Sequence, residues 1–402
     1  MAADQRRRLF DALVAAVSAN GYPATTVDEV TAGAGVSKRD FYVHFESKED
    51  CFLQAFDELL ESFARKIEAA APTHGEVAEQ VREAIEALAR IIADEPEALQ
   101  FLLVDSLTIG PAGNDPRERS QERFEAMLEA AFRRMPESRP VSEFQRRAIV
   151  IGLRLSSYRA IRDRSADSLL AAAPALSDWV LAYPTQAGRT SPTPPQQPVA
   201  AAAGEGPTAV RSGAEDPAEA DARKRILWAA AELCCQVGYR KLTIQGVSAR
   251  ARVSNRTFYQ HFESKEEALL AAFEGIAQGP LRATAEAFAS RTRWPRQAEA
   301  ALYAFLGHVQ SDTRFRQLAF LELPAIGRLG LRQIDLLMDD LKQILSPAKP
   351  DASGQDHIIR AATIGGVWGA LRHEIVGERI EKLTALAPEA VDFVIVGLSD
   401  LR

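Results

Sequence analysis

The sequence predicts an all-α protein made of two tandem halves, and three observations lead to this prediction. A stretch that begins at Gly21 recurs without a gap at Gly238. Apolar residues recur every three or four positions along the chain, the spacing of one helix face, and no segment alternates in the manner of a strand. Residues 184–217 are dominated by Pro, Ala, Gly, Ser, Thr and Gln, a composition typical of a flexible linker. We therefore predict two like halves joined by that linker.

The composition is typical of a globular protein. Of the 402 residues, 47% are hydrophobic and 26% are charged, and the length suits two or three domains. No apolar run approaches the roughly 20 residues needed to cross a membrane, and the N-terminus lacks a signal-peptide core. Three cysteines, Cys51, Cys234 and Cys235, give neither a disulfide framework nor metal-ligand spacing. We expect a cytoplasmic protein with no membrane segment, no metal and no other cofactor.

The repeated stretch has the pattern of two short helices around a tight turn. In the first copy Thr26 is placed to cap the first short helix, and Gly35 is placed to end it. Ser37 then caps the second short helix. On that helix Phe41 and Phe45 are one turn apart, so both point toward the same, inner side. This leaves polar and aromatic residues on the outer face.

The outer face of this second short helix carries hydrogen-bond donors and aromatic rings. In the first copy its residues are Lys38, Arg39, Asp40, Tyr42, Val43 and His44. In the second copy the equivalent residues are Asn255, Arg256, Thr257, Tyr259, Gln260 and His261. A helix with such a face, held at its back by a partner helix, fits the DNA major groove. The pattern predicts helix-turn-helix DNA-binding domains at 1–48 and 218–265.

The pattern Thr-Val-x-x-Val, then Gly-Val-Ser-x-x-x-Phe-Tyr-x-His-Phe-x-Ser-Lys-Glu, resembles the N-terminal domain of the TetR family of bacterial ligand-responsive repressors. The resemblance implies helical ligand-binding and dimerisation-like domains at 49–183 and 266–402, with 184–217 as the linker. It implies a double-stranded DNA operator and a small-molecule effector as partners. Members usually carry one unit and bind DNA as homodimers, so two units on one chain are a departure. We expect an intramolecular pseudo-dimer, with a further homodimer left open.

Side-chain chemistry assigns roles within the predicted interface. Phosphate contacts that set the register are expected from Thr26, Tyr42, His44 and Lys48, and from Thr243, Tyr259, His261 and Lys265. Arg39 and Arg256 can each pair with guanine. At other positions the copies differ, because Asn255 and Gln260 can pair with adenine whereas Val43 can contact a thymine methyl. The two half-sites of the operator are therefore expected to differ.

The apolar periodicity of the remaining chain predicts more helices in each half. In the first half they cover 4–20, 48–71, 76–94, 96–110, 117–135, 142–164 and 168–183. In the second half they cover 222–237, 264–291, 297–310, 313–323, 328–345, 358–376 and 389–401. The last helix but one holds Gly365, Gly366 and Gly369, matched in part by Gly152 and Ser156. Small residues let helices approach closely, so we expect the halves to meet there unless these glycines serve packing within one half.

Charge is distributed unevenly between the two DNA-binding domains. The chain has a net charge of −7, but attraction to phosphate is set locally, within about one Debye length. Residues 222–265 hold nine basic and two acidic residues, whereas residues 4–48 hold six of each. The second domain also has Arg252 where the first has Gly35. We expect the second domain to contribute more of the salt-sensitive affinity.

Candidate ligand contacts are fewer and weaker. Asp105 and Glu322 match at the repeat offset, and Tyr158 and Trp368 are on helices that can line a cavity; core packing or surface exposure is the alternative for each. The sequence has no Gly-rich phosphate loop after a strand, no nucleophile elbow and no His-Glu-x-x-His, so we do not expect an enzyme. A repressor is expected; the alternative is an architectural or protein-interaction module without sequence-specific DNA binding.

Overall fold

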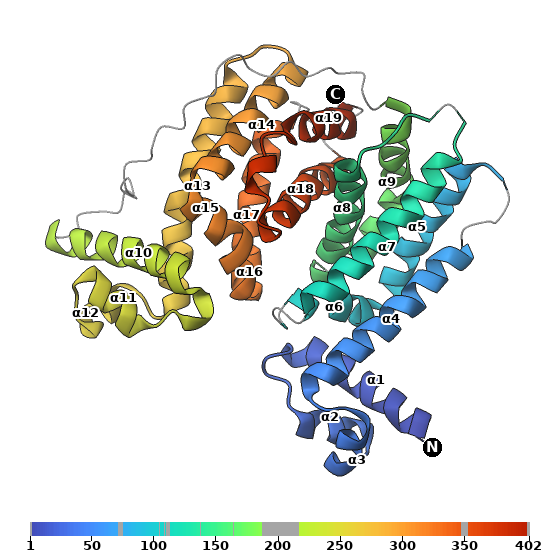
Figure 1. Cartoon of the computed structure of the whole chain (residues 1–402), viewed down its shortest axis with the longest axis horizontal. Helices are drawn as coiled ribbons and strands as arrows, with labels where there is room; N and C mark the ends of the chain where they lie inside the picture. The colour runs from blue at the N-terminus through green and yellow to red at the C-terminus, as the bar shows by residue number, and fades with distance from the viewer. Residues whose placement is uncertain are drawn as a thin grey trace. The chain divides into compact units, whose positions relative to one another are not determined.

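The computed structural model describes residues 2–70, 75–103, 105–107, 109, 113–136, 138–163, 165–186, 217–346 and 353–399. Within these ranges every regular element is helical, which confirms the all-α prediction, and no helix is long and apolar enough to cross a membrane. The predicted linker falls largely on 187–216, outside the described residues. The chain divides into two units (Figure 1). Unit 1 is Met1–Arg189, Lys349–Val367 and Val396–Leu401, and unit 2 is Thr190–Ala348, Trp368–Ile395 and Arg402.

The first head, residues 2–48, is a three-helix domain at the beginning of a long helix (Figure 1). Its elements are α1 (Ala2–Asn20), α2 (Val27–Ala34) and α3 (Lys38–His44), and the long helix is α4 (Lys48–Ala70). The predicted caps are confirmed, because Thr26 and Ser37 begin α2 and α3 with capping boxes. Gly35 ends α2 in the left-handed region at φ 62°. Phe41 and Phe45 are fully buried against α1 and α4.

The second head, residues 218–265, repeats this arrangement in unit 2. Its elements are α10 (Pro217–Val237), the 3₁₀ turn η3 (Tyr239–Lys241), α11 (Ile244–Ala251) and α12 (Asn255–His261), followed by the long α13 (Lys265–Ala289). Thr243 and Ser254 cap α11 and α12, and Phe258 is fully buried. Arg252 ends α11 at φ 55°, a left-handed conformation that is strained for a residue with a Cβ. The two heads share a scaffold, but this cap differs.

The rest of unit 1 is a helical domain that follows α4. Its elements are α5 (Val77–Asp94), α6 (Pro96–Leu103), the 3₁₀ turn η1 (Asp105–Leu107), α7 (Asn114–Arg133), α8 (Glu143–Arg162) and α9 (Ala166–Gln186). The predicted helices agree with these bounds within a few residues, except that α6 ends at Leu103 and η1 takes over before 110. Ser142 begins α8 with a capping box.

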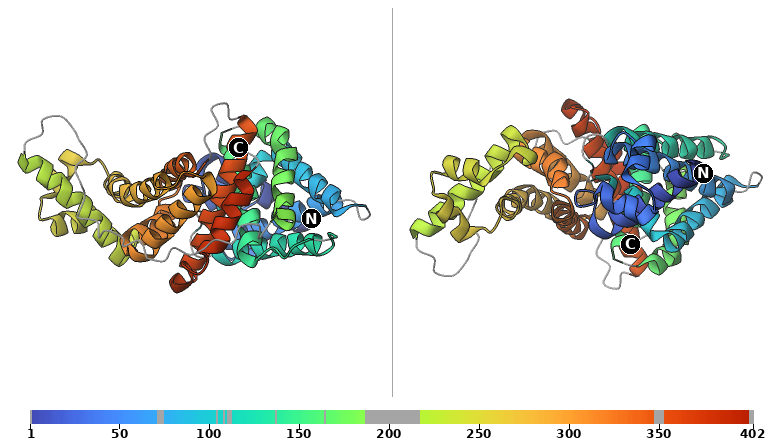
Figure 2. Two further views of the ribbon diagram at one scale, coloured as in Figure 1. Left: turned by 90° about the horizontal axis from the view of Figure 1, so that it is seen from above. Right: turned by 90° about the horizontal axis from the view of Figure 1, so that it is seen from below.

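The rest of the second half is helical, and most of it belongs to unit 2, in which α13 and α14 pack side by side (Figure 2). After α13 come α14 (Trp294–Ser311), α15 (Thr313–Gln317), η4 (Leu318–Glu322), α16 (Leu323–Ala325), α17 (Arg328–Leu345), α18 (Gly354–Val376), η5 (Ile380–Lys382) and α19 (Ala387–Leu398). The single α-helix predicted over 313–323 is wrong over Leu318–Glu322, where η4 is a π-helix. Such a wide turn depends on tertiary packing, which apolar periodicity does not encode.

Unit 1 also contains residues 354–367 of α18, which pack against α8 and α9. Trp179 Nε1 donates to Thr363 Oγ1 at 3.0 Å, and Gln355 Nε2 donates to the carbonyl oxygen of Ala171 at 2.9 Å. A Cβ added to Gly152 would lie 2.5 Å from the carbonyl oxygen of Ala362, a distance that real side chains do not reach. The absence of a side chain at Gly152 therefore permits this close helix packing.

The repeat extends into the contacts between each head and its helical domain. Gln100 Nε2 donates to the carbonyl oxygen of Ser18 at 3.1 Å, and at the same repeat offset Gln317 Nε2 donates to that of Cys235 at 2.6 Å. Gln100 thereby connects α6 to the first head, and Gln317 connects α15 to the second head. Two matched contacts of this kind indicate that the halves share tertiary packing as well as sequence.

Candidate nucleic-acid interface

The outer faces of α3 and α12 are open to solvent in their respective units. Tyr42 and Val43 are 53% and 73% exposed, and Tyr259 is 59% exposed. Among the other outer-face residues, Lys38, Arg39, Asn255, Arg256 and Gln260 are also exposed, and Asp40 and Thr257 are half-buried. Exposed aromatic rings beside cationic and amide side chains can contact phosphates and base edges at once. The structure thus gathers the predicted base contacts of each head on one short helix.

Aromatic packing behind each reading helix fixes its orientation. Phe41 meets Tyr42 edge to face at 5.3 Å between ring centroids, and Phe258 meets Tyr259 in the same way at 5.7 Å. His44 and His261 are half-buried, each near the phenylalanine that follows it. Each tyrosine therefore contacts a buried ring of its own helix while more than half of the residue stays exposed, which is compatible with the predicted phosphate contact.

In the first head, carboxylates occupy much of the surface near α3. Lys38 Nζ is 2.9 Å from Asp28 Oδ1, and this partner raises the pKa of the Lys38 ammonium. Asp40 Oδ2 accepts from the hydroxyl of Ser37 at 2.7 Å and from its backbone N at 3.3 Å, and these bonds lower the pKa of the Asp40 carboxyl. Glu29 Oε2 accepts from the hydroxyl of Thr26 at 3.0 Å and from its backbone N at 2.7 Å. The predicted contacts Thr26 and Lys38 thus already have anionic partners.

In the second head the equivalent positions lack these acids. Gly246 replaces Glu29. The hydroxyl of Thr243 still accepts from the backbone amide at this position, at 3.1 Å, but it has no carboxylate to donate to among the described residues. Thr257 replaces Asp40 and lies 2.9 Å from the hydroxyl of Ser254, oxygen to oxygen. At these positions the second head therefore has uncharged residues where the first has carboxylates.

Lys48 and Lys265 are placed differently from the other predicted phosphate contacts. Lys48 Nζ donates to the carbonyl oxygens of Tyr22 and Thr25 at 2.8 and 2.6 Å and lies 4.2 Å from the centroid of the Tyr22 ring. Lys265 Nζ donates to those of Tyr239 and Leu242 at 3.3 and 2.9 Å. Burial lowers the pKa of the Lys48 ammonium. Each lysine thus ties a long helix to the preceding turn, and its predicted phosphate contact stays a prediction.

The four candidate ligand residues are divided between the units, with Asp105 and Tyr158 in unit 1 and Glu322 and Trp368 in unit 2. Asp105 is buried in η1, and the ring of Tyr158 has the guanidinium of Arg162 over it at 5.7 Å. The Glu322 carboxylate accepts from the Tyr239 backbone N at 2.7 Å and so connects η4 to the second head. Trp368 is buried and stacks on Phe320 with ring centroids 4.0 Å apart. Their ligand roles remain predictions.

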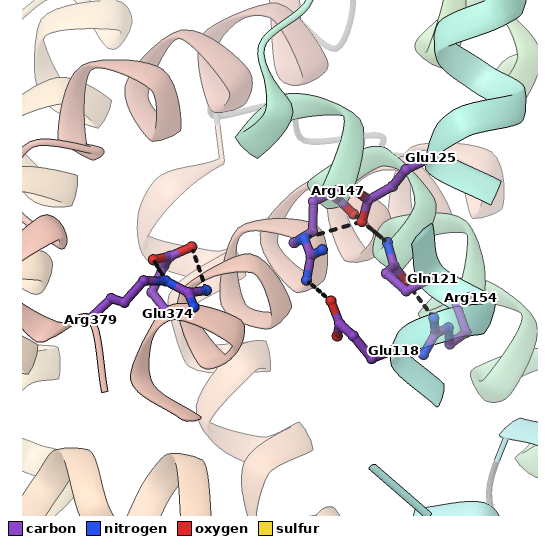
Figure 3. Close-up of polar contacts among 7 residues, drawn as sticks. All are labelled: Glu118, Gln121, Glu125, Arg147, Arg154, Glu374 and Arg379. Atoms are coloured by element: carbon purple, nitrogen blue, oxygen red, sulfur yellow. Dashed lines mark hydrogen bonds and ion pairs between the residues drawn. The ribbon is translucent and has the colours of Figure 1, made fainter. Parts of the chain in front are cut away.

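A buried polar cluster between α7 and α8 escaped sequence reasoning (Figure 3). Arg147 Nη1 donates to Glu118 Oε1 at 2.7 Å, and its Nε lies 3.1 Å from Glu125 Oε1. Gln121 donates to Glu125 at 2.9 Å and accepts from Arg154. Figure 3 also shows the Glu374–Arg379 pair of unit 2, joined at 2.7 Å. Neither Arg147 nor Arg154 belongs to a sequence motif. The one signal in the sequence is their seven-residue spacing on α8, which places both on the same face of the helix.

Comparisons with known proteins agree with the geometry of the heads. The model of the family described as bacterial regulatory proteins, tetR family, matches residues 9–55 and again residues 226–272. A search of curated proteins gives no match. The family assignment therefore depends on the two matched segments, each of which spans a complete helix-turn-helix and the start of the long helix after it.

Several solved structures are similar to parts of the chain. A TetR-like transcriptional regulator from Rhodococcus sp. RHA1 is 18% identical, covers 44% of this chain and 96% of its own, and has a TM-score of 0.37. The transcriptional regulator FadR from Bacillus subtilis, solved in complex with stearoyl-CoA, is 17% identical, with coverages of 43% and 96% and a TM-score of 0.39. The fatty acid degradation regulator FadR from Bacillus halodurans is 16% identical, with coverages of 44% and 94% and a TM-score of 0.39.

Proposed function

The chain is a TetR-family protein with two tandem units, and from this premise we propose that it is a sequence-specific DNA-binding transcriptional regulator controlled by a small-molecule ligand. The observation that carries the proposal is the pair of exposed reading faces on α3 and α12, each mounted on a buried phenylalanine. An architectural module would need backbone contacts alone and no base-reading residues. Arg39 and Arg256 can pair with guanine in the same way from both heads.

We further propose that the two halves form an intramolecular pseudo-dimer. Support comes from unit 1, in which residues 354–367 of the second half pack on α8 and α9 of the first. Gly152 and Gly365 both lie at points of close approach, the latter with Leu155 Cδ1 only 2.7 Å from where a Cβ would be. The indole of Trp179 adds a buried hydrogen bond to Thr363. Buried polar contacts of this kind favour one register of packing over others.

The regulator is proposed to act as a repressor in the bacterial cytoplasm, where its operator would be accessible. Its effector would bind one or both helical domains, and Asp105, Tyr158, Glu322 and Trp368 remain the candidate contacts. Glu322 has a particular position among them, because its bond to the Tyr239 backbone N joins the helical domain directly to the second head. A ligand that moves η4 would therefore move the head with it.

The proposal is tested by selecting duplexes from a random DNA library with the full chain, then measuring affinity for the selected and scrambled duplexes. We expect a preference of at least about 10³-fold, the lower range for specific binding. In the double variant Arg39→Ala with Arg256→Ala, discrimination between the selected and the scrambled duplex should fall by about 1–3 kcal/mol for each guanine contact removed. Arg90→Ala, which removes an exposed arginine on α5, is the control and should bind normally.

Two results would contradict the proposal. Equal affinity for selected and scrambled duplexes would favour the architectural alternative. A minimal complex that always contains two chains, and hence four heads, on one selected duplex would reject the single-chain pseudo-dimer. Native mass spectrometry of the complex measures this stoichiometry directly.

A further inference from the structure

We infer that the two heads bind DNA unequally: the second head supplies most of the attraction to the phosphate backbone, while carboxylates of the first head suppress its own. This inference rests on the proposed DNA-binding function and adds a division of labour to it. It concerns the surface around the reading helices, which differs more between the heads than their buried scaffold does. The probe that reveals it is DNA of random sequence.

The first observation is a set of three acid replacements around the reading helices. Asp28, Glu29 and Asp40 of the first head correspond to Gln245, Gly246 and Thr257 of the second. The first two are exposed and the third is half-buried at the start of α3. A carboxylate within about one Debye length of a phosphate repels it. The same backbone positions are uncharged in the second head.

A second observation is that one cation of the first reading helix is already paired. Lys38 is held by Asp28 at 2.9 Å, and both side chains are largely exposed. An exposed pair of this kind contributes little to stability. It nonetheless cancels the charge that Lys38 would offer to a phosphate. Arg39 is the other cation at the exposed face of α3, and no ion pair between it and an acid is found among the described residues.

The second head, by contrast, adds exposed cations at positions that are uncharged in the first. Arg240 and Lys241 replace Pro23 and Ala24 in the turn before α11, and Arg252 replaces Gly35. All three are exposed, and no ion pair with an acid is found for them in the described part of the chain. A cation without an acidic partner is available to phosphates, and each neutralised phosphate releases counterions.

Arg252 provides independent support because its backbone is strained. Its φ of 55° is left-handed, a conformation that is strained for a residue with a Cβ and nearly free of strain for a glycine. The first head has Gly35 in this conformation, at φ 62°. The second head therefore keeps a cation at a position where glycine would fit more easily. Strain of this kind is often associated with function.

The test measures how affinity for a short random-sequence duplex depends on salt between about 50 and 200 mM, with the full chain throughout. Lys241→Ala with Arg252→Gly removes cations of the second head. Asp28→Gln with Asp40→Thr removes acids of the first, using residues that the second head has at those positions. Arg256→Ala and Arg39→Ala form a matched pair that removes the same side chain from each head. Melting of each variant checks folding.

Each phosphate contact adds about −0.9 to the slope of log affinity against log salt. Lys241→Ala with Arg252→Gly should therefore flatten the slope by up to about 1.8, although Arg252→Gly relieves strain and should melt no lower. Asp28→Gln with Asp40→Thr should steepen the slope by about 0.9, because Lys38 becomes available. Arg256→Ala should weaken random-duplex binding more than Arg39→Ala. The variants that remove acids show an effect even if those that remove cations fold poorly.

The outcomes separate this inference from the proposed function. Unchanged slopes in both double variants, or equal losses from Arg39→Ala and Arg256→Ala, would overturn the inequality of the heads while selected-duplex binding still stood. Failure of the unaltered chain to bind any duplex would overturn the DNA-binding proposal and this inference together.

Discussion

The buried sides of α3 and α12 are alike, whereas their exposed sides have diverged. Phe41 and Phe258 are both fully buried and both meet the following tyrosine edge to face. On the exposed side Val43 stands where the second head has Gln260. Packing constrains the buried residue because any change leaves a cavity or a clash, while solvent tolerates many residues on the outer face. The two copies therefore share the buried contacts that hold each reading helix, whereas the exposed residues predicted to contact bases differ between them.

The largest predicted effect tests the shared scaffold. Phe41→Ala and Phe258→Ala should each lower the local stability of their head by about 3–5 kcal/mol, since each removes a fully buried ring. Hydrogen exchange of the helices in each head measures this locally, which suits a chain with two units. The exposed outer-face variants Val43→Ala and Gln260→Ala are controls and should change stability by less than about 0.5 kcal/mol. Losses that differ between the heads by more than about 2 kcal/mol would contradict a common scaffold.

A second prediction concerns matched glycines at the start of α7 and in α17. A Cβ added to Gly330 would clash severely with the backbone carbonyl oxygen of Leu323. A Cβ added to Gly113 would clash first with the side chain of Ile109, and the Ser106 carbonyl oxygen would lie 2.9 Å away. The Ile109 side chain can move by changing its rotamer, whereas the Leu323 carbonyl oxygen can move only together with the main chain. Gly330→Ala should cost about 3 kcal/mol and Gly113→Ala less, in thermal unfolding. Equal melting temperatures for the two variants would contradict this ranking.

A third prediction concerns the lysine ties. Lys48→Met and Lys265→Met should each cost about 2 kcal/mol, because each removes charge-assisted hydrogen bonds to two carbonyl oxygens. Hydrogen exchange of the turn before α2 or α11 should increase accordingly. The exposed Lys38→Met, which lacks such bonds to the backbone, is the control and should leave exchange unchanged. If Lys48→Met weakened DNA binding without altering exchange, the lysine would act only as a phosphate contact.

The smallest predicted effect concerns base readout. Gln260→Val gives the second head the residue of the first, so the selected site should become more symmetric. Loss of a bidentate contact to adenine lowers discrimination at one base pair by about 1 kcal/mol or somewhat more. Affinity for the half-site of the first head should stay the same. A selected site with unchanged asymmetry after Gln260→Val would show that other residues distinguish the halves.

The sequence predicted best what depends on local chemistry. The caps Thr26, Gly35 and Ser37 were identified because each acts within three or four residues of itself. The ties made by Lys48 were not, because they reach carbonyl oxygens more than twenty residues away. The π-helix η4 was likewise missed, since its wide turn depends on packing around Phe320 and Trp368. The candidate DNA contacts remain predictions at the level of single base pairs.

The packing of α18 shows the same limit of sequence reasoning. Its glycines indicated close helix contact, yet only the structure pairs Gly152 with the Ala362 carbonyl and Gly365 with Leu155. Helical periodicity gives the face of a helix but not its partner, because many helices present similar apolar faces. The Arg147 cluster was missed for the same reason, since its partners Glu118 and Glu125 are on another helix.

The central claim is that one chain reads one operator with two different heads. The most direct test is the sequence selected from a random library by the full chain. We predict an imperfect palindrome with a guanine at equivalent places in both halves, contacted by Arg39 and Arg256, and with different bases opposite Val43 and Gln260. A perfectly palindromic selected site would contradict the claim, because it would mean that the two heads read DNA identically or that identical heads of two chains are used.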